Sequence, residues 1–304
     1  MNNKKIVIIG SSNTDMVIIS ERIPQPGETI LGGTFFMNPG GKGANQAVAI
    51  SRLGGEVMFI TKTGNDLFGR QSVELYASEG IGTNYVFSDN KKPSGVALIM
   101  VDSKGENCIA VASGANSSLS PKDINKAKSI IEKASIILMQ MEIPVETIAY
   151  VVQLANKNHI KVILNPAPAG PLPDELISSL HIITPNKMEA EMLSGIKVTG
   201  WKSAKKAADI ISAKGVDIVI ITLGALGALI KEGRTYHNIP AEIVTAIDTT
   251  AAGDVFNGAL CVAIAEGMNV VDAARFACKA SSIAVTRMGA QSSIPYRKEL
   301  DAIL

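Results

Sequence analysis

The feature that most constrains the fold is an alternation between short, uniformly apolar segments and segments with helical periodicity. The apolar segments lack the apolar–polar alternation of a half-exposed strand, so we expect strands buried on both faces. Helical periodicity marks residues 144–158 and 201–215, which lie between such strands along the chain. This order is typical of an α/β fold with a doubly wound, mostly parallel sheet flanked by helices. The predicted strands are residues 5–10, 135–141, 160–166, 181–186 and 217–224.

Two segments depart from this alternation. Residues 14–37 contain strand-like runs joined by a link rich in proline and glycine, and residues 95–112 form two strand-like runs around the polar turn DSKGEN. We therefore predict a single α/β domain over residues 1–304, with a small β-sheet lid formed by about residues 14–37 and 95–112. A small sheet has too little core to be stable alone, so an exposed apolar lid face favours a homodimer through lid-to-lid packing.

Composition and charge exclude several classes of partner. Lys and Arg number 29 against 28 Asp and Glu, giving a net charge of +1, so we expect no nucleic-acid partner and no membrane partner. No apolar stretch approaches the roughly 20 residues that a membrane span requires. Cys108, Cys261 and Cys278 lie far apart and form no CxxC pair, which is typical of reduced thiols. The prediction is a cytoplasmic protein.

The segment NPGGKGANQAVAISRLG (38–54) combines a glycine-rich turn with an apolar helix. Glycines allow a close approach of the backbone to a ligand, and the free N–H groups of a helix that begins near Ala44 would point into a site. The simpler interpretation is a glycine turn before a buried helix. Asn45, a polar residue one turn into this apolar helix, favours a ligand contact.

Polar side chains also follow two of the predicted strands. Asn13 and Asp15 lie just beyond the first strand, where ligands bind in open α/β sheets, and their spacing places them on one side of an extended chain. An Asx-turn at the strand end is an equally good interpretation. Glu142 follows a buried strand, and an acid there is costly unless it has partners, so we expect it to face a cleft.

Asn186 and Glu189 are three residues apart and would share one face of a helix that begins near Asn186. An amide and a carboxylate so placed could hold Mg²⁺ through water, although Asn is also an ordinary N-cap residue.

The stretch DTTAAGDVFNG (248–258) places small residues before an acid at an expected helix start. A helix from about Ala252 would leave the amides of Ala252, Gly253 and Asp254 unpaired, and the small side chains would let an anion reach them. Asp254 beside such an anion hole could act as a general base, a pairing that suits phosphoryl transfer. A simple capping aspartate would explain the acid but not the row of small residues.

Taken together, these motifs resemble the ribokinase family of carbohydrate kinases over the whole chain. The stretches that carry the resemblance occur in the family's order: GSSNTD, GGKGANQAVA, LNPAPA, TPNKMEAE, ITLGALGA, DTTAAGDVFNGAL and AVTRMGAQSSIP. The resemblance implies transfer of the ATP γ-phosphate to O5 of D-ribose, giving D-ribose 5-phosphate and ADP, with ATP, Mg²⁺ and K⁺ as cofactors.

The resemblance also implies a role for each matching residue. Asp254 would deprotonate the sugar hydroxyl, with Ala252 and Gly253 in the anion hole. The residues implied to bind the sugar are Asn13, Thr14, Asp15, Gly41, Lys42, Gly43, Ala44, Asn45, Glu142 and Asp254. Those implied to bind the nucleotide are Asn186, Thr222, Leu223, Gly224, Ala225, Leu226, Gly227, Gly253, Asp254 and Cys278. Those implied to hold K⁺ are Asp248, Thr250, Ala284, Arg287, Gly289 and Ser293, while Glu189 would serve Mg²⁺ indirectly.

Two alternatives remain open at this point. One is another sugar kinase of the same family, such as a deoxyribokinase. The other is a non-catalytic sugar-binding regulator, although such a protein has no need for a base at Asp254.

Overall fold

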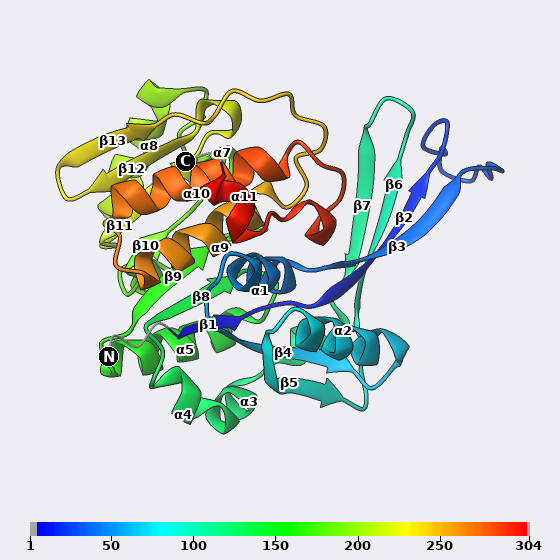
Figure 1. Ribbon diagram of the computed structural model, residues 1–304, viewed down its shortest axis with the longest axis horizontal. Helices are drawn as coiled ribbons and strands as arrows, with labels where there is room; N and C mark the ends of the chain where they lie inside the picture. The colour runs from blue at the N-terminus through cyan, green and yellow to red at the C-terminus, as the bar shows by residue number, and fades with distance from the viewer. Residues whose placement is uncertain (1–4, 303–304) are drawn as a thin grey trace.

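The computed structural model describes residues 5–302, and its main element is a sheet of nine strands within that range (Figure 1). Six neighbouring pairs from β11 to β5 are parallel, and two antiparallel strands extend the β11 edge. The predicted doubly wound, mostly parallel sheet is therefore confirmed. In sheet order the strands are β13 (Thr235–Ile239), β12 (Ala228–Glu232), β11 (Ile218–Thr222), β10 (Ile182–Ile183), β9 (Lys161–Asn165), β8 (Ile136–Gln140), β1 (Ile6–Ile9), β4 (Val57–Gly64) and β5 (Gly82–Asp89).

Helices cover both faces of this sheet and create two apolar cores. Along β1, Ile6 and Ile8 enter one core while Val7 and Ile9 enter the other, because successive side chains of a strand point to opposite faces. The first core packs against α1 (Lys42–Arg52), α2 (Leu67–Ser78), α9 (Ala252–Ala265), α10 (Val270–Ala284) and α11 (Arg297–Asp301). The second packs against α3 (Pro121–Lys126), α4 (Lys128–Ile131), α5 (Val145–Lys157), α6 (Asp174–Ile177), α7 (Lys187–Ser194) and α8 (Trp201–Ser212).

The strand expected over residues 181–186 is shorter than predicted. Strand β10 spans only Ile182–Ile183, although the Thr184 amide still donates to the Leu164 carbonyl at 3.0 Å. Pro185 follows, and because proline has no N–H group it cannot continue the ladder.

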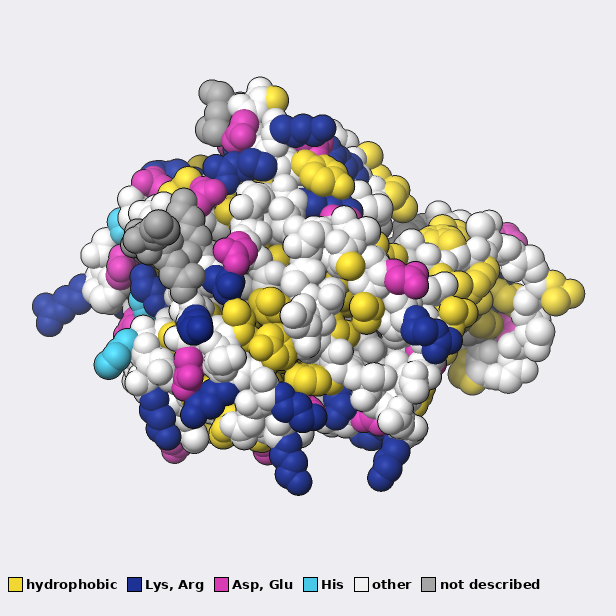
Figure 2. Space-filling view, turned by 60° about the horizontal axis from the view of Figure 1, so that its bottom comes forward, with side chains coloured by type: hydrophobic (Ala, Val, Ile, Leu, Met, Phe, Trp, Pro, Cys, Tyr) yellow, Lys and Arg dark blue, Asp and Glu magenta, His cyan; other side chains and the backbone are white. Residues whose placement is uncertain are grey.

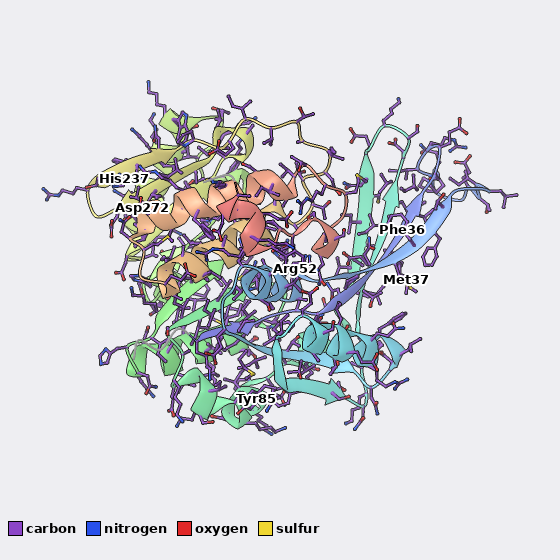
Figure 3. The ribbon with its side chains drawn as sticks, in the orientation of Figure 1. Phe36, Met37, Arg52, Tyr85, His237 and Asp272 are labelled. Atoms are coloured by element: carbon purple, nitrogen blue, oxygen red, sulfur yellow. The ribbon has the colours of Figure 1, made fainter. Side chains whose placement is uncertain are left out.

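A second sheet of four strands projects from the body, as predicted for the lid (Figure 1). Its order is β3 (Thr34–Gly40), β2 (Asn13–Ile19), β6 (Gly95–Val101) and β7 (Asn107–Ala112). Every residue of β7 is exposed, and Figure 3 shows Phe36 and Met37 on the projecting sheet. Apolar side chains gather on this projection in the space-filling view (Figure 2). The lid therefore leaves apolar surface uncovered.

The strand order reverses direction at β1, which lies between β8 and β4. In open α/β sheets, ligands bind beyond the carboxyl ends of the strands at such a switch point. Here β1 leads through residues 10–12 into β2 of the lid, and β8 ends two residues before Glu142. Among residues 5–302, no helix is long and apolar enough to cross a membrane.

Candidate active site

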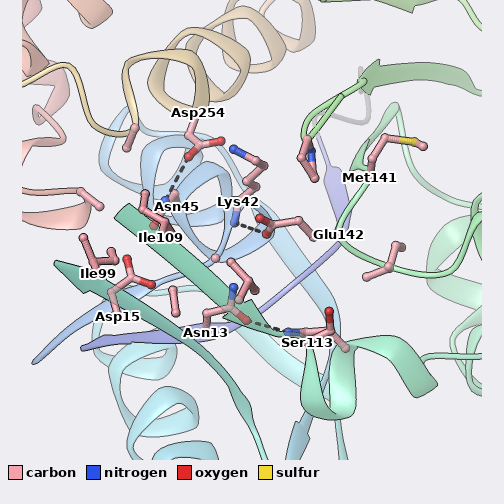
Figure 4. A pocket seen from close by; sticks show the side chains of 18 of the residues that line it. Asn13, Asp15, Lys42, Asn45, Ile99, Ile109, Ser113, Met141, Glu142 and Asp254 are labelled. Atoms are coloured by element: carbon pink, nitrogen blue, oxygen red, sulfur yellow. Dashed lines mark hydrogen bonds between the residues drawn. The ribbon is translucent and has the colours of Figure 1, made fainter. Parts of the chain in front are cut away.

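A cavity of about 670 Å³ lies between the lid and the carboxyl ends of the main strands. Figure 4 shows Asp254 on one side of the opening, Asn13 and Asp15 on the other, and Lys42 and Glu142 between them. The lid adds an apolar wall that includes Ala97, Ile99, Ile109 and Val111. Of the residues implied to bind the sugar, the cavity brings together Asn13, Asp15, Gly41, Lys42, Asn45, Glu142 and Asp254.

Three residues of that predicted set do not line the cavity. Gly43 and Ala44 are buried in α1, and Thr14 lies on β2 between the two residues that do face the cavity. Gly43 has a packing role, since a Cβ there would meet the Ser11 amide nitrogen at 2.6 Å. The glycine thus allows the helix to approach the end of β1.

The start of α1 corrects one prediction. The helix begins at Lys42, two residues before the expected start, and its first amides already have partners within the protein. The Lys42 amide donates to Glu142 Oε2 at 3.0 Å, and the Gly43 amide donates to Ser11 Oγ at 3.3 Å. The prediction of free N–H groups at this helix start is therefore wrong. Glu142, which the Ser11 hydroxyl also contacts, caps the helix start while facing the cavity.

The start of α9 agrees more closely with the prediction. The helix begins at Ala252, preceded by Ala251 in the left-handed region with a φ of 59°. The Ala252 amide donates to the Thr249 carbonyl at 3.3 Å, so the expectation that it is unpaired is wrong. The backbone N–H groups of Gly253 and Asp254 have no hydrogen-bond acceptor within residues 5–302. Two free amides, rather than three, therefore remain for an anion.

The Asp254 side chain is only 6% exposed and is held by two carboxamides. Asn45 Nδ2 donates to Asp254 Oδ2 at 3.0 Å, and Gln46 Nε2 donates to Asp254 Oδ1 at 2.9 Å. Burial raises the pKa of Asp254, while the Lys42 charge and these two hydrogen bonds act in the opposite direction. The carboxylate is thus fixed in orientation and poorly solvated.

Lys42 is the cation that faces the acids of this site. Burial alone would lower the pKa of Lys42, but the charges of Asp254, Glu142, Glu189 and Asp15 outweigh burial and raise it. Burial also raises the pKa of Asp15 to about 6, and the Glu142 and Asp254 charges add to that effect. These acids and the Lys42 ammonium therefore share a poorly solvated space.

A second cavity of about 200 Å³ adjoins the first and shares Lys42, Ala251 and Asp254 with it. Gly253 and Asn257 also line it. Its remaining lining residues are Asn165, Ala167, Thr184, Asn186, Glu189, Thr222, Thr249 and Ala252. Asp254 therefore lies at the junction of the two cavities.

Asn186 and Glu189 form a capping box at the start of α7, so the N-cap interpretation is realised. Asn186 Oδ1 accepts from the Glu189 amide at 2.9 Å, and Glu189 Oε2 accepts from the Asn186 amide at 2.8 Å. Both residues nevertheless line the smaller cavity. Burial raises the pKa of Glu189. No group of three or more His, Cys, Asp or Glu residues suited to a metal ion occurs in the described part of the chain.

The segment predicted to line the nucleotide site lies mostly outside the two cavities. Thr222 lines the smaller cavity, Leu223 is fully buried, and a 3₁₀ turn over Gly224–Leu226 lies at the surface before Gly227. Cys278 is 7% exposed on α10 and lines neither cavity.

Hydrogen bonds connect only some of the residues that are implied to hold a monovalent cation. Asp248 Oδ1 accepts from the amide and the hydroxyl of Thr250 at 2.9 and 2.6 Å, and Asp248 Oδ2 accepts from the Gly289 amide at 2.8 Å. The Ile247 and Asp248 amides donate to the Val285 carbonyl at 2.7 and 3.2 Å. This loop is therefore packed on the segment that follows α10.

The other three residues of that set make contacts within or behind their own segment. The Ala284 carbonyl accepts from the Arg287 amide at 3.0 Å, and the Arg287 guanidinium pairs with Glu299. Ser293 Oγ donates to the Ala290 carbonyl at 2.8 Å. Arg287 could thus offer only its backbone carbonyl to a cation.

Several polar residues at the site were missed by the sequence reasoning. Gln46, Gln140 and Asn165 form hydrogen bonds behind Asp254, and Asn116 donates to Asn13 Oδ1 at 2.7 Å. The available signals were weak: Gln46 is a second polar residue in an apolar helix, and Gln140 and Asn165 end apolar strands.

Comparisons with known proteins agree with this geometry. A family model described as pfkB family carbohydrate kinase matches residues 3–297. A ribokinase of Haemophilus influenzae is 44% identical over 296 residues, covering 97% of each chain. A deoxyribokinase of Salmonella typhi is 35% identical over 300 residues, covering 98% of each chain. A solved structure of Arabidopsis thaliana ribokinase complexed with ribose and ATP has a TM-score of 0.91 at 33% identity, covering 98% of this chain and 97% of that one. The chain therefore belongs to the pfkB family of carbohydrate kinases.

Proposed function

We propose that this protein catalyses the ribokinase reaction, the transfer of the ATP γ-phosphoryl group to O5 of D-ribose, which gives D-ribose 5-phosphate and ADP. The observation that carries the proposal is the position of Asp254, which lines both the larger and the smaller cavity. The relatives named ribokinase match nearly the whole chain, which supports the proposal.

In this proposal the larger cavity holds the sugar. Asn13, Asp15 and Glu142 offer an amide and two carboxylates to sugar hydroxyls, and the apolar lid residues cover the carbon face of the ring. Asn45 lines the same cavity, but its amide nitrogen already donates to Asp254. Its contact with a sugar is therefore secondary to its contact with the base.

Asp254 removes the proton from the sugar 5-hydroxyl as that oxygen attacks the γ-phosphorus. The proton goes to the carboxylate, the new O–P bond forms, and the bond from phosphorus to the leaving oxygen of ADP breaks. The free amides of Gly253 and Asp254, with the Lys42 ammonium, stabilise the negative charge on the transferred group. The small side chains of residues 251–253 let the phosphoryl group come close to those amides.

The side chains of Asn186 and Glu189 suit a divalent cation bound to the ATP phosphates. Asn186 and Glu189 would hold Mg²⁺ through water, because their side chains line the smaller cavity but are tied to each other in the capping box. Mg²⁺ supplies charge neutralisation at the ATP phosphates. Thr222 to Gly227 and Cys278 would lie along the rest of the nucleotide.

The oxygen atoms around Asp248 are of the kind that a monovalent cation prefers. The Asp248 carboxylate and the backbone carbonyl of Thr250 would hold the ion, and Ala284, Arg287, Gly289 and Ser293 would complete its shell. K⁺ would hold this loop directly before the residues that bind the anion. We expect faster turnover in K⁺ than in Na⁺ at equal ionic strength, and equal rates in the two salts would contradict the assignment.

We also propose a homodimer in which the lids of two copies pack together. Ile109 and Val111 line the larger cavity yet remain 53% exposed each, so one chain alone does not cover this apolar wall. A second lid would bury it and raise the share of apolar surface removed from water.

The deciding experiment is an ADP-release assay with ATP and a panel of D-ribose, 2-deoxyribose and fructose. The highest kcat/KM with ribose supports the proposal, and a higher value with 2-deoxyribose would favour the deoxyribokinase reaction, after which the Salmonella typhi relative is named. Sugar binding without ADP release would instead identify a regulator. Mass spectrometry of the product distinguishes phosphorylation from ATP hydrolysis.

A further inference from the structure

Behind Asp254 lies a chain of buried side-chain carboxamides formed by Gln46, Gln140 and Asn165. Gln46 comes from α1, while Gln140 and Asn165 are the last residues of β8 and β9. Gln46 and Gln140 are fully buried, Asn165 is 6% exposed, and neither glutamine lines either cavity. These glutamines therefore do not contact a ligand in either cavity.

The hydrogen bonds of this carboxamide chain fix the orientation of Gln46. Gln46 Nε2 donates to Asp254 Oδ1 at 2.9 Å and to Asn165 Oδ1 at 3.1 Å, which uses both of its N–H groups. Gln46 Oε1 accepts from Gln140 Nε2 at 2.5 Å. Asn165 is held in turn, because its Nδ2 donates to the Thr184 carbonyl at 3.2 Å. A rotation of the Gln46 amide by 180° would place its oxygen against two other oxygens.

We infer that Gln46 is a positioning residue that holds the Asp254 carboxylate in one orientation and in its ionised form. The inference rests on the proposed function in one respect, namely that Asp254 is the base. Gln46 and Asn45 each bind one oxygen of the carboxylate, so together they define its plane. A donor that faces a carboxylate favours the charged form over the protonated form.

The other charged groups around Asp254 act from a greater distance. Lys42 faces it from α1, Glu142 from the loop after β8, Asp15 from β2 of the lid and Glu189 from α7. In the part of the chain that is described, none of them hydrogen-bonds to Asp254, and the donors to its oxygens are the two carboxamides. Asn45 also lines the sugar cavity, whereas Gln46 does not. A substitution of Gln46 therefore tests the positioning of Asp254 without removing a residue that lines the sugar cavity.

The test compares Gln46→Met with the wild-type protein in steady-state kinetics over a range of pH. Methionine fills a similar volume but donates no hydrogen bond. We expect kcat to fall at least tenfold, the KM values for ribose and ATP to change less than threefold, and the acidic limb of the kcat profile to move to higher pH. An unchanged kcat, or raised KM values with an unmoved acidic limb, would overturn the inference.

Two further variants guard against a merely structural effect. Thr61→Val is the matched control, because Thr61 is fully buried on β4 and its hydroxyl has no hydrogen-bond partner within residues 5–302. We expect it to keep the wild-type profile. Gln140→Met removes the anchor of Gln46 but keeps the Gln46 donor, so it should move kcat and the acidic limb in the same direction by a smaller factor. If Gln46→Met does not fold, Gln140→Met alone decides, and a wild-type profile there would overturn the inference.

A second readout does not depend on turnover. The side-chain carboxyl of Asp254 can be titrated by ¹³C NMR in aspartate-labelled protein, with Asp254→Asn identifying the resonance. We expect a higher titration midpoint in Gln46→Met than in the wild type, and an equal midpoint would overturn the inference even if ribose is not the substrate. Lack of ADP release by the wild type would count against the proposed function alone.

Discussion

The main sheet and the lid sheet differ in how many of their faces the protein covers. Strand β1 is buried at every residue, with helices on both sides, whereas every residue of lid strand β7 is exposed. The body thus holds Asp254 and its hydrogen-bond partners in fixed positions, while the lid contributes one wall of the larger cavity and keeps an uncovered apolar face. Changes in the body should therefore alter catalysis or stability, and changes in the lid should alter sugar binding or assembly.

The sharpest test of the body is the substitution Asp254→Asn. The amide keeps the shape of the side chain but cannot accept the sugar proton, so kcat should fall by about 10²–10⁴, the range for a lost general base. Calorimetric affinities for ATP and ribose should stay within a few-fold of the wild type. A kcat within tenfold of the wild type would remove Asp254 from its proposed role.

A core substitution tests whether stability resides in the body. Phe59 on β4 is fully buried and packs edge-to-face on Tyr76, with ring centroids 5.2 Å apart. Phe59→Ala should lower the free energy of unfolding by about 3–5 kcal/mol. The matched lid variant is Phe35→Ala, since Phe35 is 56% exposed and its truncation should cost about 0.5 kcal/mol or less. Urea denaturation measures both, and similar losses would break the contrast between body and lid.

The contrast also explains which features could be predicted from the sequence. Strands covered on both faces are apolar throughout, so β1, β8, β9 and β11 are recognisable, and the lid is recognisable because its paired strands lack a connecting helix. Those signals are local. The early end of β10, before Pro185, depends on a single missing N–H group, which the apolar pattern of the segment does not reveal.

The site was less predictable because its contacts join distant segments. Asn13, Glu142 and Asp254 could be chosen because each follows a strand or opens a helix. By contrast, the contact between Gln46 and Asp254 spans 208 residues, and no local pattern distinguishes Gln46 from an ordinary polar residue in a helix. The wrong prediction of free amides at α1 has the same origin, since their partners, Ser11 and Glu142, come from other segments.

Lid assembly is tested by two substitutions of equal chemistry on opposite faces of the lid sheet. Ile109 lines the larger cavity and is 53% exposed, and its partner on β6, Ile99, also lines it, whereas Leu98, the residue before Ile99, is 55% exposed and does not line the cavity. Ile109→Glu would bury a charge between two lids and should convert the dimer into monomers, with a raised KM for ribose. Leu98→Glu should leave the dimer intact. Light scattering after size exclusion measures the mass, and an unaffected Ile109→Glu dimer would exclude this face.

The smallest expected effect concerns Asp15, where the lid meets the body. Its pKa is raised to about 6, chiefly by burial and then by the Glu142 and Asp254 charges. A group with a folded pKa above its unfolded value contributes stability that is present below the unfolded pKa, near 3.8, and is lost as pH rises through about 6. The ionised carboxylate is thus unfavourable in the folded protein at neutral pH.

Asp15→Asn should consequently raise the Tm at pH 7.5 by a few degrees relative to the wild type, and this advantage should vanish near pH 4, where the wild-type carboxyl is protonated in the folded protein. The same titration should raise the wild-type KM for ribose as pH falls through about 6, because the protonated group accepts sugar hydroxyls less well. Differential scanning calorimetry at both pH values measures the first effect. A Tm difference that does not change with pH would show that the pKa of Asp15 is not raised in the folded protein.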